Sequence, residues 1–162
     1  MGLMVVLQRA TFEDCKLVYN WRNELASRKG SLSSSPISWE DHQEWFNKRL
    51  HLSHNETIWM ALSVCELETE PVGYGRILLE DNDVGVVSVT VGPSFRGHGI
   101  GKAIVTLLRD KIWAMDRVAI ARVKTDNDVS LGLFGSVGFV LDNSSFIGSI
   151  RRNGYVVLKA SP

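Results

Sequence analysis

The feature that most constrains the fold is a glycine-rich turn between two apolar runs, residues 89–104, which read VTVGPSFRGHGIGKAI. The valines before the turn alternate as in a strand, and the isoleucines after it are spaced as in a helix. Such turns often hold phosphate, because the glycine backbone curls and its N–H groups point into one concavity at the positive end of the helix. The structural alternative is a tight turn that binds nothing.

Two familiar nucleotide-binding patterns do not fit this turn. A P-loop needs a glycine, four residues, and then Gly-Lys-Ser/Thr. Here Gly101-Lys102 is followed by Ala103, so the hydroxyl that would hold magnesium is missing, and Arg96 replaces the first glycine. A dinucleotide fingerprint needs the order G-x-G-x-x-G, and its third glycine is replaced by Lys102. The turn therefore predicts a phosphate other than that of ATP or NAD.

Two segments resemble the GCN5-related N-acetyltransferase (GNAT) family. Arg96 to Gly101, RGHGIG, matches the acyl-CoA signature R/Q-x-x-G-x-G/A and follows the strand end Val89-Thr90-Val91. Asn127 to Phe139, NDVSLGLFGSVGF, matches a later motif of the family, N-x-x-S/A-x-x-L/F-Y/F-x-x-x-G-F. The resemblance implies that acetyl-CoA is the co-substrate and that the turn binds its pyrophosphate. The cofactor-binding residues it implies are Val89, Val91, Arg96, Gly97, His98, Gly99, Ile100, Gly101, Lys102, Asn127, Ser130 and Phe134.

Periodicity along the chain predicts a single α/β domain over residues 1–162, in the order β α α β β β α β α β β. The expected mixed sheet has a central antiparallel meander and one parallel crossover at the glycine turn, and the resemblance implies the GNAT fold. Capping-box signatures at 11–14 and 38–41 open the first two helices, and 31–36 is expected to be a loop. Strands are expected at 4–10, 57–64, 72–79, 85–91, 118–123, 138–140 and 155–158, and helices at 11–24, 38–50, 100–115 and 127–136.

Acetyl transfer to an amine needs a neutral amine, a donor for the oxyanion and a proton for the leaving thiolate. The resemblance assigns the oxyanion donor to the backbone N–H of Val91. It places the usual proton-donating tyrosine at Phe134, which has no hydroxyl and for which the favoured interpretation is packing against the cofactor. Ser130 is a candidate donor, directly or through water; the alternative is a serine that bonds its own helix backbone. Candidates for the base are Glu80, at the end of a strand, and His42, on the second helix. For these two the alternatives are a solvated carboxylate and a packed imidazole.

The N-terminal third carries the candidates for acceptor binding, because the first two helices of the family cover the acceptor. The arrangement W-R-N…H-x-x-W-F over residues 21–46 resembles the branch that acetylates nucleotide-linked amino sugars, as in pseudaminic acid biosynthesis. Tryptophans stack on a base or a sugar, and arginines bind a diphosphate through paired hydrogen bonds; the alternative for the aromatic residues is the core. The expected acceptor-binding residues are Trp21, Arg22, Asn23, Arg28, Trp45 and Arg76.

The composition of the chain argues against several other kinds of partner. Lys plus Arg and Asp plus Glu are 18 each, and this balance argues against nucleic acid as a partner. The two cysteines form no Cys/His cluster, so we expect no metal and a reducing, cytoplasmic setting. No apolar run approaches a membrane span. Two other functions stay open, a protein N-terminal acetyltransferase of the ribosomal-protein type and a non-catalytic CoA-binding module. The sequence leaves the choice between monomer and homodimer open.

Overall fold

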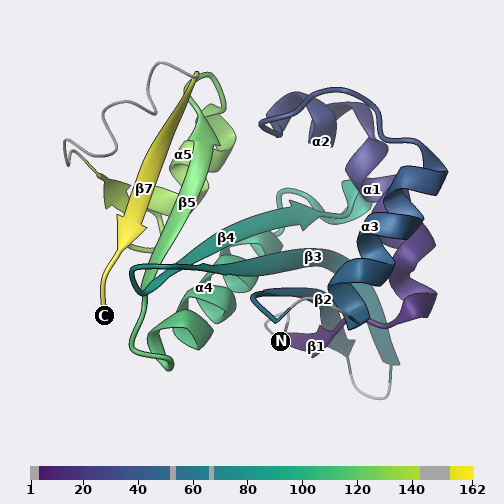
Figure 1. Ribbon diagram of the computed structural model, residues 1–162, viewed down its shortest axis with the longest axis horizontal. Coiled ribbons are helices and arrows are strands. Elements are labelled where there is room, and N and C mark those ends of the chain that lie inside the picture. The colour runs from purple at the N-terminus through teal and green to yellow at the C-terminus, as the bar shows by residue number, and fades with distance from the viewer. Residues whose placement is uncertain (1–3, 52–53, 66–67, 143–153) are drawn as a thin grey trace.

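The computed structural model describes residues 4–51, 54–65, 68–142 and 154–162. Its centre is a seven-stranded sheet in the order β1-β2-β3-β4-β5-β7-β6 (Figure 1). All neighbouring strands are antiparallel except β4 and β5, which are parallel. The predicted mixed sheet with a central meander is confirmed. The strands are β1 (Met4–Arg9), β2 (Glu56–Cys65), β3 (Glu68–Glu80), β4 (Val84–Val91), β5 (Val118–Lys124), β6 (Val140–Leu141) and β7 (Tyr155–Ala160).

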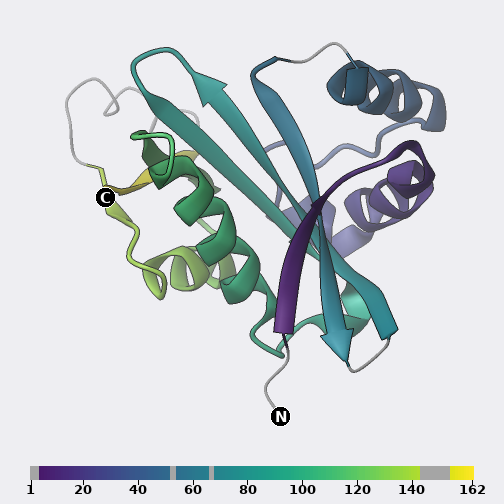
Figure 2. The same ribbon diagram turned by 90° about the horizontal axis from the view of Figure 1, so that it is seen from below.

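Helices cover both faces of the sheet. The helix after the glycine turn, α4, lies on one face together with α5, and α1 and α3 lie on the other (Figure 2). The helices are α1 (Cys15–Asn23), α2 (Leu25–Gly30), α3 (Trp39–His51), α4 (Ile100–Trp113) and α5 (Asp128–Gly135), with short 3₁₀ turns η1 (Phe12–Asp14) and η2 (Pro93–Phe95). None of the helices in the described part of the chain is both long and apolar enough to cross a membrane.

Local capping explains where the first helices begin. The Asp14 carboxylate accepts a hydrogen bond from the Thr11 N–H at 2.8 Å, and the Ser38 hydroxyl oxygen accepts from the Asp41 N–H at 3.0 Å. Both predicted capping signatures therefore lie at helix starts. The sequence missed α2, which begins after Glu24, because glutamate is not among the favoured N-cap residues.

The C-terminal strand predicted at 138–140 is shorter and later than expected. Gly138 has a φ of +90° and ends the turn after α5, so pairing begins only at Val140. The neighbouring expectation, a strand from Tyr155, is confirmed as β7.

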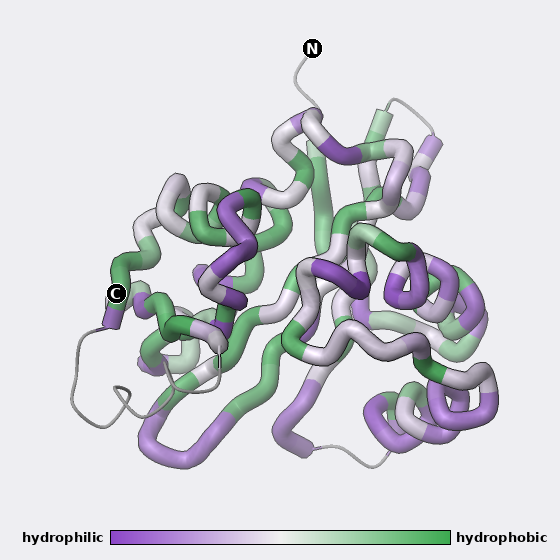
Figure 3. The backbone as a smooth tube through the Cα atoms, turned by 90° about the horizontal axis from the view of Figure 1, so that it is seen from above, coloured by the Kyte–Doolittle hydropathy of each residue, from purple (hydrophilic) through white to green (hydrophobic). Residues whose placement is uncertain are grey.

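Two apolar layers hold the sheet between the helices. On one face, Ile104, Leu108 and Ile112 of α4 are fully buried against β3, β4 and β5. On the other, Val18 of α1 and Phe46 of α3 are buried in a second cluster over β2 and β3. The helices alternate between hydrophobic and hydrophilic residues, whereas the central strands carry longer hydrophobic stretches (Figure 3). The central strands are thus fixed from both sides.

The two parallel strands separate along their length. β4 pairs with β5 only from Val84 to Val86, but it stays paired with β3 as far as Val91. Beyond Val86 the strands diverge and leave a wedge in the sheet (Figure 1). The glycine turn follows β4 at the wide end of this wedge, so the fold places the turn beside an opening in the sheet.

Candidate active site

The glycine turn has the geometry of an anion site. Gly97 and Gly99 have φ values of +80° and +78°, a region that side chains disfavour, and a Cβ at either position would touch nothing within 4 Å. The glycines are therefore required by backbone conformation rather than by space. The first hydrogen bond of α4 runs from the Ala103 N–H to the Gly99 carbonyl at 3.1 Å. The N–H groups of residues 100–102 precede that bond and are free of intrahelical partners.

Side chains at the turn are arranged around this backbone. His98 and Lys102 are exposed at its rim, whereas Ile100 is buried under the sheet. A Cβ on Gly101 would lie 3.2 Å from Leu133 and 3.4 Å from Val91. The start of α4 is thus packed closely between β4 and α5, which brings the turn next to the wedge.

The end of β4 turns backbone donors into the wedge. The Gly92 N–H donates to the Val72 carbonyl of β3 at 2.9 Å. In an antiparallel pair, alternate residues face the partner strand. Val89 and Val91 are therefore the residues whose N–H groups point away from β3, toward the side that β5 has left. This is the orientation that an oxyanion donor at Val91 requires.

Two cavities meet at the wedge. The Arg96 cavity has a volume of about 520 Å³, and the Arg22 cavity, on the side of β3, has a volume of about 400 Å³. Two cavities with a common wall suit the transfer of a chemical group between two bound molecules. The residues lining both cavities are Gly30, Ser31, Val89, Thr90, Asn127 and Ser130.

The start of α5 forms part of this shared wall. The Asn127 side chain caps α5, accepting from the Ser130 N–H at 3.0 Å, and donates to the Gly30 carbonyl of α2 at 3.0 Å. The Ser130 hydroxyl makes no hydrogen bond within the described ranges. Phe134, one turn later, is buried, packs edge-to-face on Phe139 and lines the Arg22 cavity. The three predicted α5 residues therefore lie together beside the wedge.

The Arg22 cavity holds three arginines, two of which have carboxylate partners. Arg76 donates to Glu56 at 2.9 Å. Arg122 makes paired 2.8 Å hydrogen bonds to the two oxygens of Glu80. These bonds hold the pKa of Glu80 below its ordinary value, although partial burial opposes the shift, and they raise the pKa of Arg122. Glu80 is therefore a fixed anion that neutralises an arginine, and it does not suit the predicted role of a base.

Arg22 differs from the other two arginines. Its Nη2 donates to the Ser33 carbonyl at 3.0 Å, but its Nη1 is buried and has no hydrogen-bond partner in the part of the chain that the structure describes. Burial lowers the pKa of this guanidinium, with nearby Arg76 and Arg28 adding to the effect and Tyr74 opposing it. An unsatisfied, desolvated cationic donor on the cavity wall is suited to an anionic ligand.

His42, the second candidate for the base, lies in the core between α1 and α3. It is 1% exposed, its Nε2–H donates to the Cys15 carbonyl at 3.0 Å, and its ring contacts four aromatic rings. Desolvation is the main cause that lowers its pKa. It borders neither cavity, so the structure favours the packing alternative. The rings around it are those of Tyr19, Trp39, Trp45 and Phe46.

Several predicted acceptor residues support the walls instead of lining them. Trp21 is 8% exposed and packs in the cluster beneath α1. Asn23 exchanges two 2.8 Å hydrogen bonds with the backbone of Ile37, and Arg28 donates to the carbonyls of Asn23 and Ser34. Trp45 lies under the Arg76 guanidinium at 5.4 Å. Of the six predicted residues, Arg22 and Arg76 line the Arg22 cavity, and the other four border neither of the two cavities at the wedge.

Sequence reasoning missed other lining residues, Tyr74, Ser88, Thr90 and Arg122. The signal was present, since residues at spacing two on β3 and on β4 share a face. Arg76 fixes that face on β3, and Tyr74 follows from it. The identity of the β5 neighbour, Arg122, depends on how the strands diverge, which periodicity does not give.

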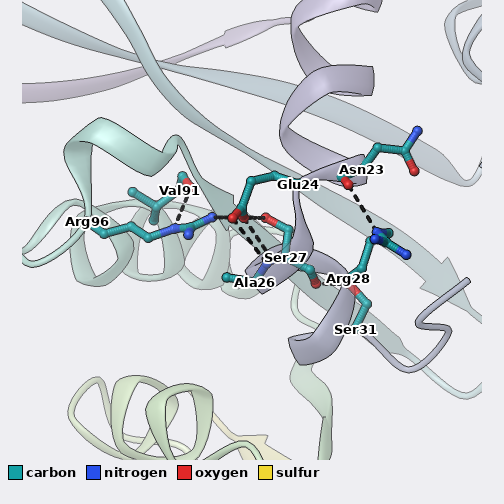
Figure 4. Close-up of polar contacts among 8 residues, drawn as sticks. All are labelled: Asn23, Glu24, Ala26, Ser27, Arg28, Ser31, Val91 and Arg96. Atoms are coloured by element: carbon teal, nitrogen blue, oxygen red, sulfur yellow. Dashed lines mark hydrogen bonds and ion pairs between the residues drawn. The ribbon is translucent and has the colours of Figure 1, made fainter. Parts of the chain in front are cut away.

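The signature arginine of the turn is joined to α2 (Figure 4). Arg96 Nη2 lies 2.8 Å from Glu24 Oε2 and 3.0 Å from the Ser27 hydroxyl oxygen, and its Nε donates to the Val91 carbonyl at 3.3 Å. Mainly through the bond from Arg96, with help from two backbone N–H groups, the pKa of Glu24 falls to about 2. The guanidinium therefore connects the end of β4 with the start of α2.

Within the described ranges, no three His, Cys, Asp or Glu side chains gather as a metal site.

Comparison with known protein families finds a match for most of the chain. The family model described as "Acetyltransferase (GNAT) family" matches residues 16–139. N-alpha-acetyltransferase RimI of Mycobacterium tuberculosis is 41% identical over 54 residues, a match that spans 33% of this chain and 33% of that protein.

Solved structures share the fold over nearly the whole chain. A domain from Methanocaldococcus jannaschii superposes with a TM-score of 0.84 at 20% identity and covers 99% of this chain and 100% of its own. Spermidine N-acetyltransferase from Vibrio cholerae, in complex with CoA and spermine, superposes with a TM-score of 0.77 at 14% identity, covering 96% of this chain and 92% of its own. At these identities the likeness shows the fold.

Proposed function

The chain belongs to the acetyltransferase (GNAT) family, and we propose on that premise that it is an N-acetyltransferase that uses acetyl-CoA to acetylate a primary amine. The observation that carries the proposal is the wedge between β4 and β5, where two cavities meet at one wall beside a glycine turn. Acetyl-CoA supplies the activated acyl group. The chain supplies position, charge and hydrogen-bond donors.

The residues of the turn and the wedge have distinct roles in this proposal. The unpaired N–H groups at the start of α4 bind the pyrophosphate, which the helix dipole also favours. The Arg96 cavity takes the pantetheine arm, with Val89 pairing to it as a strand would. The Val91 N–H, pointing into the wedge, donates to the carbonyl oxygen as it becomes an oxyanion.

Proton transfers involve few side chains. Ser130 lines both cavities and is our candidate to protonate the leaving thiolate, directly or through water; Phe134 packs beside it and has no proton to give. Neither Glu80 nor His42 is placed as a base. We therefore assign deprotonation of the ammonium to water, and most of the acceleration to positioning of the two reactants.

For the acceptor, the Arg22 cavity favours an amine that carries an anionic group. Its walls hold Arg22, Arg76 and Arg122, and within the described ranges only the last two have carboxylate partners. We propose a nucleotide-linked amino sugar, whose diphosphate would accept from Arg22. The RimI relative supports a second candidate, a protein N-terminus, with a nearby acidic side chain or carboxylate taking the place of the phosphate.

A thiol-release assay tests the proposal. Acetyl-CoA would be presented with nucleotide-linked 4-amino sugars, with peptides bearing free N-termini and with spermidine, and the melting temperature would be followed with CoA alone. We expect turnover with an anionic amine. Turnover of peptides only would refute the sugar acceptor, and binding of CoA without any thiol release would leave the non-catalytic CoA-binding module.

The variant Arg22→Met tests the assigned anion contact. Loss of one charged hydrogen bond should raise the acceptor KM by roughly tenfold or more, while the KM for acetyl-CoA stays unchanged. Arg9→Met is the matched control. Arg9 belongs to the edge strand β1, where its guanidinium lies over the Trp59 ring, and it borders neither cavity. An unchanged acceptor KM in Arg22→Met would exclude this contact.

A further inference from the structure

The short helix α2 forms a wall of both cavities. Ala26, Ser27 and Lys29 line the Arg96 cavity, and Gly30 lines both. The loop that follows, as far as Ser33, lines the Arg22 cavity. The position of α2 therefore sets the shape of the donor site and of the acceptor site at the same time.

α2 is held at its two ends by contacts to opposite sides of the wedge. At its C-terminal end, the Gly30 carbonyl accepts from Asn127 of α5 at 3.0 Å, and the Lys29 carbonyl accepts from the Lys124 ammonium of β5 at 3.1 Å. These two contacts are the far anchor of α2. They join it to the side of the sheet that has separated from β4.

At the N-terminal end, one carboxylate has two functions. Glu24 breaks the helical path, with φ −60° and ψ 140°, and its oxygens accept from the N–H groups of Ala26 at 3.1 Å and Ser27 at 3.0 Å. Oε2, the oxygen that accepts from the Ser27 N–H, also accepts from Arg96 Nη2 at 2.8 Å. Glu24 is thus both the N-cap of α2 and its connection to the glycine turn (Figure 4).

We propose that Glu24 is a positioning residue which, through Arg96, holds α2 where it forms the common wall of the two cavities. The inference rests on the proposed function. Arg96 also holds the Val91 carbonyl, so one guanidinium aligns the strand that presents the oxyanion donor with the helix that bounds the acceptor. Without this connection, α2 keeps its far anchor, the Arg28 bond to the Asn23 carbonyl and the Ser27 contact with Arg96. These contacts lack the charged bond to Arg96, so the acceptor wall is held less firmly relative to Val91.

Two variants separate tethering from capping. Glu24→Asp keeps a charged and favoured N-cap but is one methylene too short to cap α2 and reach Arg96 together. Glu24→Gln keeps the reach and an accepting oxygen but loses the charge. The proposal expects Glu24→Asp to have the larger effect, raising the KM for the acceptor and the KM for acetyl-CoA about tenfold each, because α2 lines both cavities. Glu44→Gln is the control, since Glu44 pairs with Lys48 on the exposed side of α3.

Hydrogen–deuterium exchange provides a readout that needs no turnover. In Glu24→Asp, amides of residues 26–33 should exchange faster than in the wild-type protein, and CoA should protect them less; Glu44→Gln should match the wild type. Unchanged exchange at 26–33, an unchanged acceptor KM, or a larger effect from Glu24→Gln than from Glu24→Asp would each overturn the inference. If no amine is acetylated, the proposed function fails, and the exchange experiment alone decides whether the tether exists.

Discussion

Alanine at Gly99 and at Gly132 should change stability in opposite directions. Both glycines stand in open space, because a Cβ at either position would meet no atom within 4 Å. Packing therefore contributes nothing to the comparison, and only backbone conformation differs. Gly99 has a φ of +78°, whereas Gly132 lies within α5.

The expected magnitudes follow from those conformations. A left-handed conformation costs a residue with a Cβ roughly 1–2 kcal/mol, so Gly99→Ala should destabilise the fold by about that amount. In a helix, alanine is favoured over glycine by about 0.5–1 kcal/mol, so Gly132→Ala should stabilise it. For a chain of this size, about 2–4 °C of melting temperature corresponds to each kcal/mol. The two variants should then melt several degrees apart, on opposite sides of the wild type.

Thermal unfolding followed by circular dichroism measures this difference directly. Repeating the melts with CoA adds a functional readout, because the turn at Gly99 is the proposed pyrophosphate site, and the CoA-dependent rise should shrink in Gly99→Ala. Gly99→Ala melting at or above the wild-type temperature would refute the reasoning, as would equal losses in both variants.

Two further predictions concern the core. Gly75→Ala would place a Cβ 2.4 Å from Leu108 and 3.2 Å from the Ser88 carbonyl, and this overpacking should cost about 1–3 kcal/mol in urea unfolding; an unchanged midpoint would contradict it. Burial lowers the pKa of His42 from its ordinary 6.5, so the unfolded chain binds the proton more readily, and stability should fall as pH drops from about 6.5 toward the lower folded value. His42→Gln should reduce that slope in melts at pH 7.5 and 5.5, and an identical slope would exclude His42 as its source.

Local pattern gave the site's framework but not its charge partners. The turn at Gly97 and Gly99 follows from glycine conformation, which is visible in the sequence. The donor at Val91 came from the family resemblance, because strand alternation alone does not say which residues turn their N–H groups away from β3. The partner of Arg96 was not predictable, because Glu24 lies 72 residues away and caps a helix that propensity did not indicate. Glu80 meets Arg122 across 42 residues, at a place fixed by the divergence of β4 and β5. The sequence alone does not distinguish a His42 in the core from a His42 in a cavity, because that difference depends on how α1 and α3 pack together.

The charges in the Arg22 cavity limit what the substrates of proteins with a similar fold can say about the acceptor of this chain. The V. cholerae enzyme of similar fold is a spermidine N-acetyltransferase with spermine bound, and spermine is a polycation. In this chain, Glu56 and Glu80 are occupied by Arg76 and Arg122, so their negative charge is not available to an incoming ammonium. Among the described residues that line this cavity, the buried Nη1 of Arg22 remains without a partner, and its positive charge would repel a polycation and attract an anion. At 14% identity the shared fold does not carry the polyamine acceptor to this protein, and the charge of the Arg22 cavity favours the anionic acceptor that we propose.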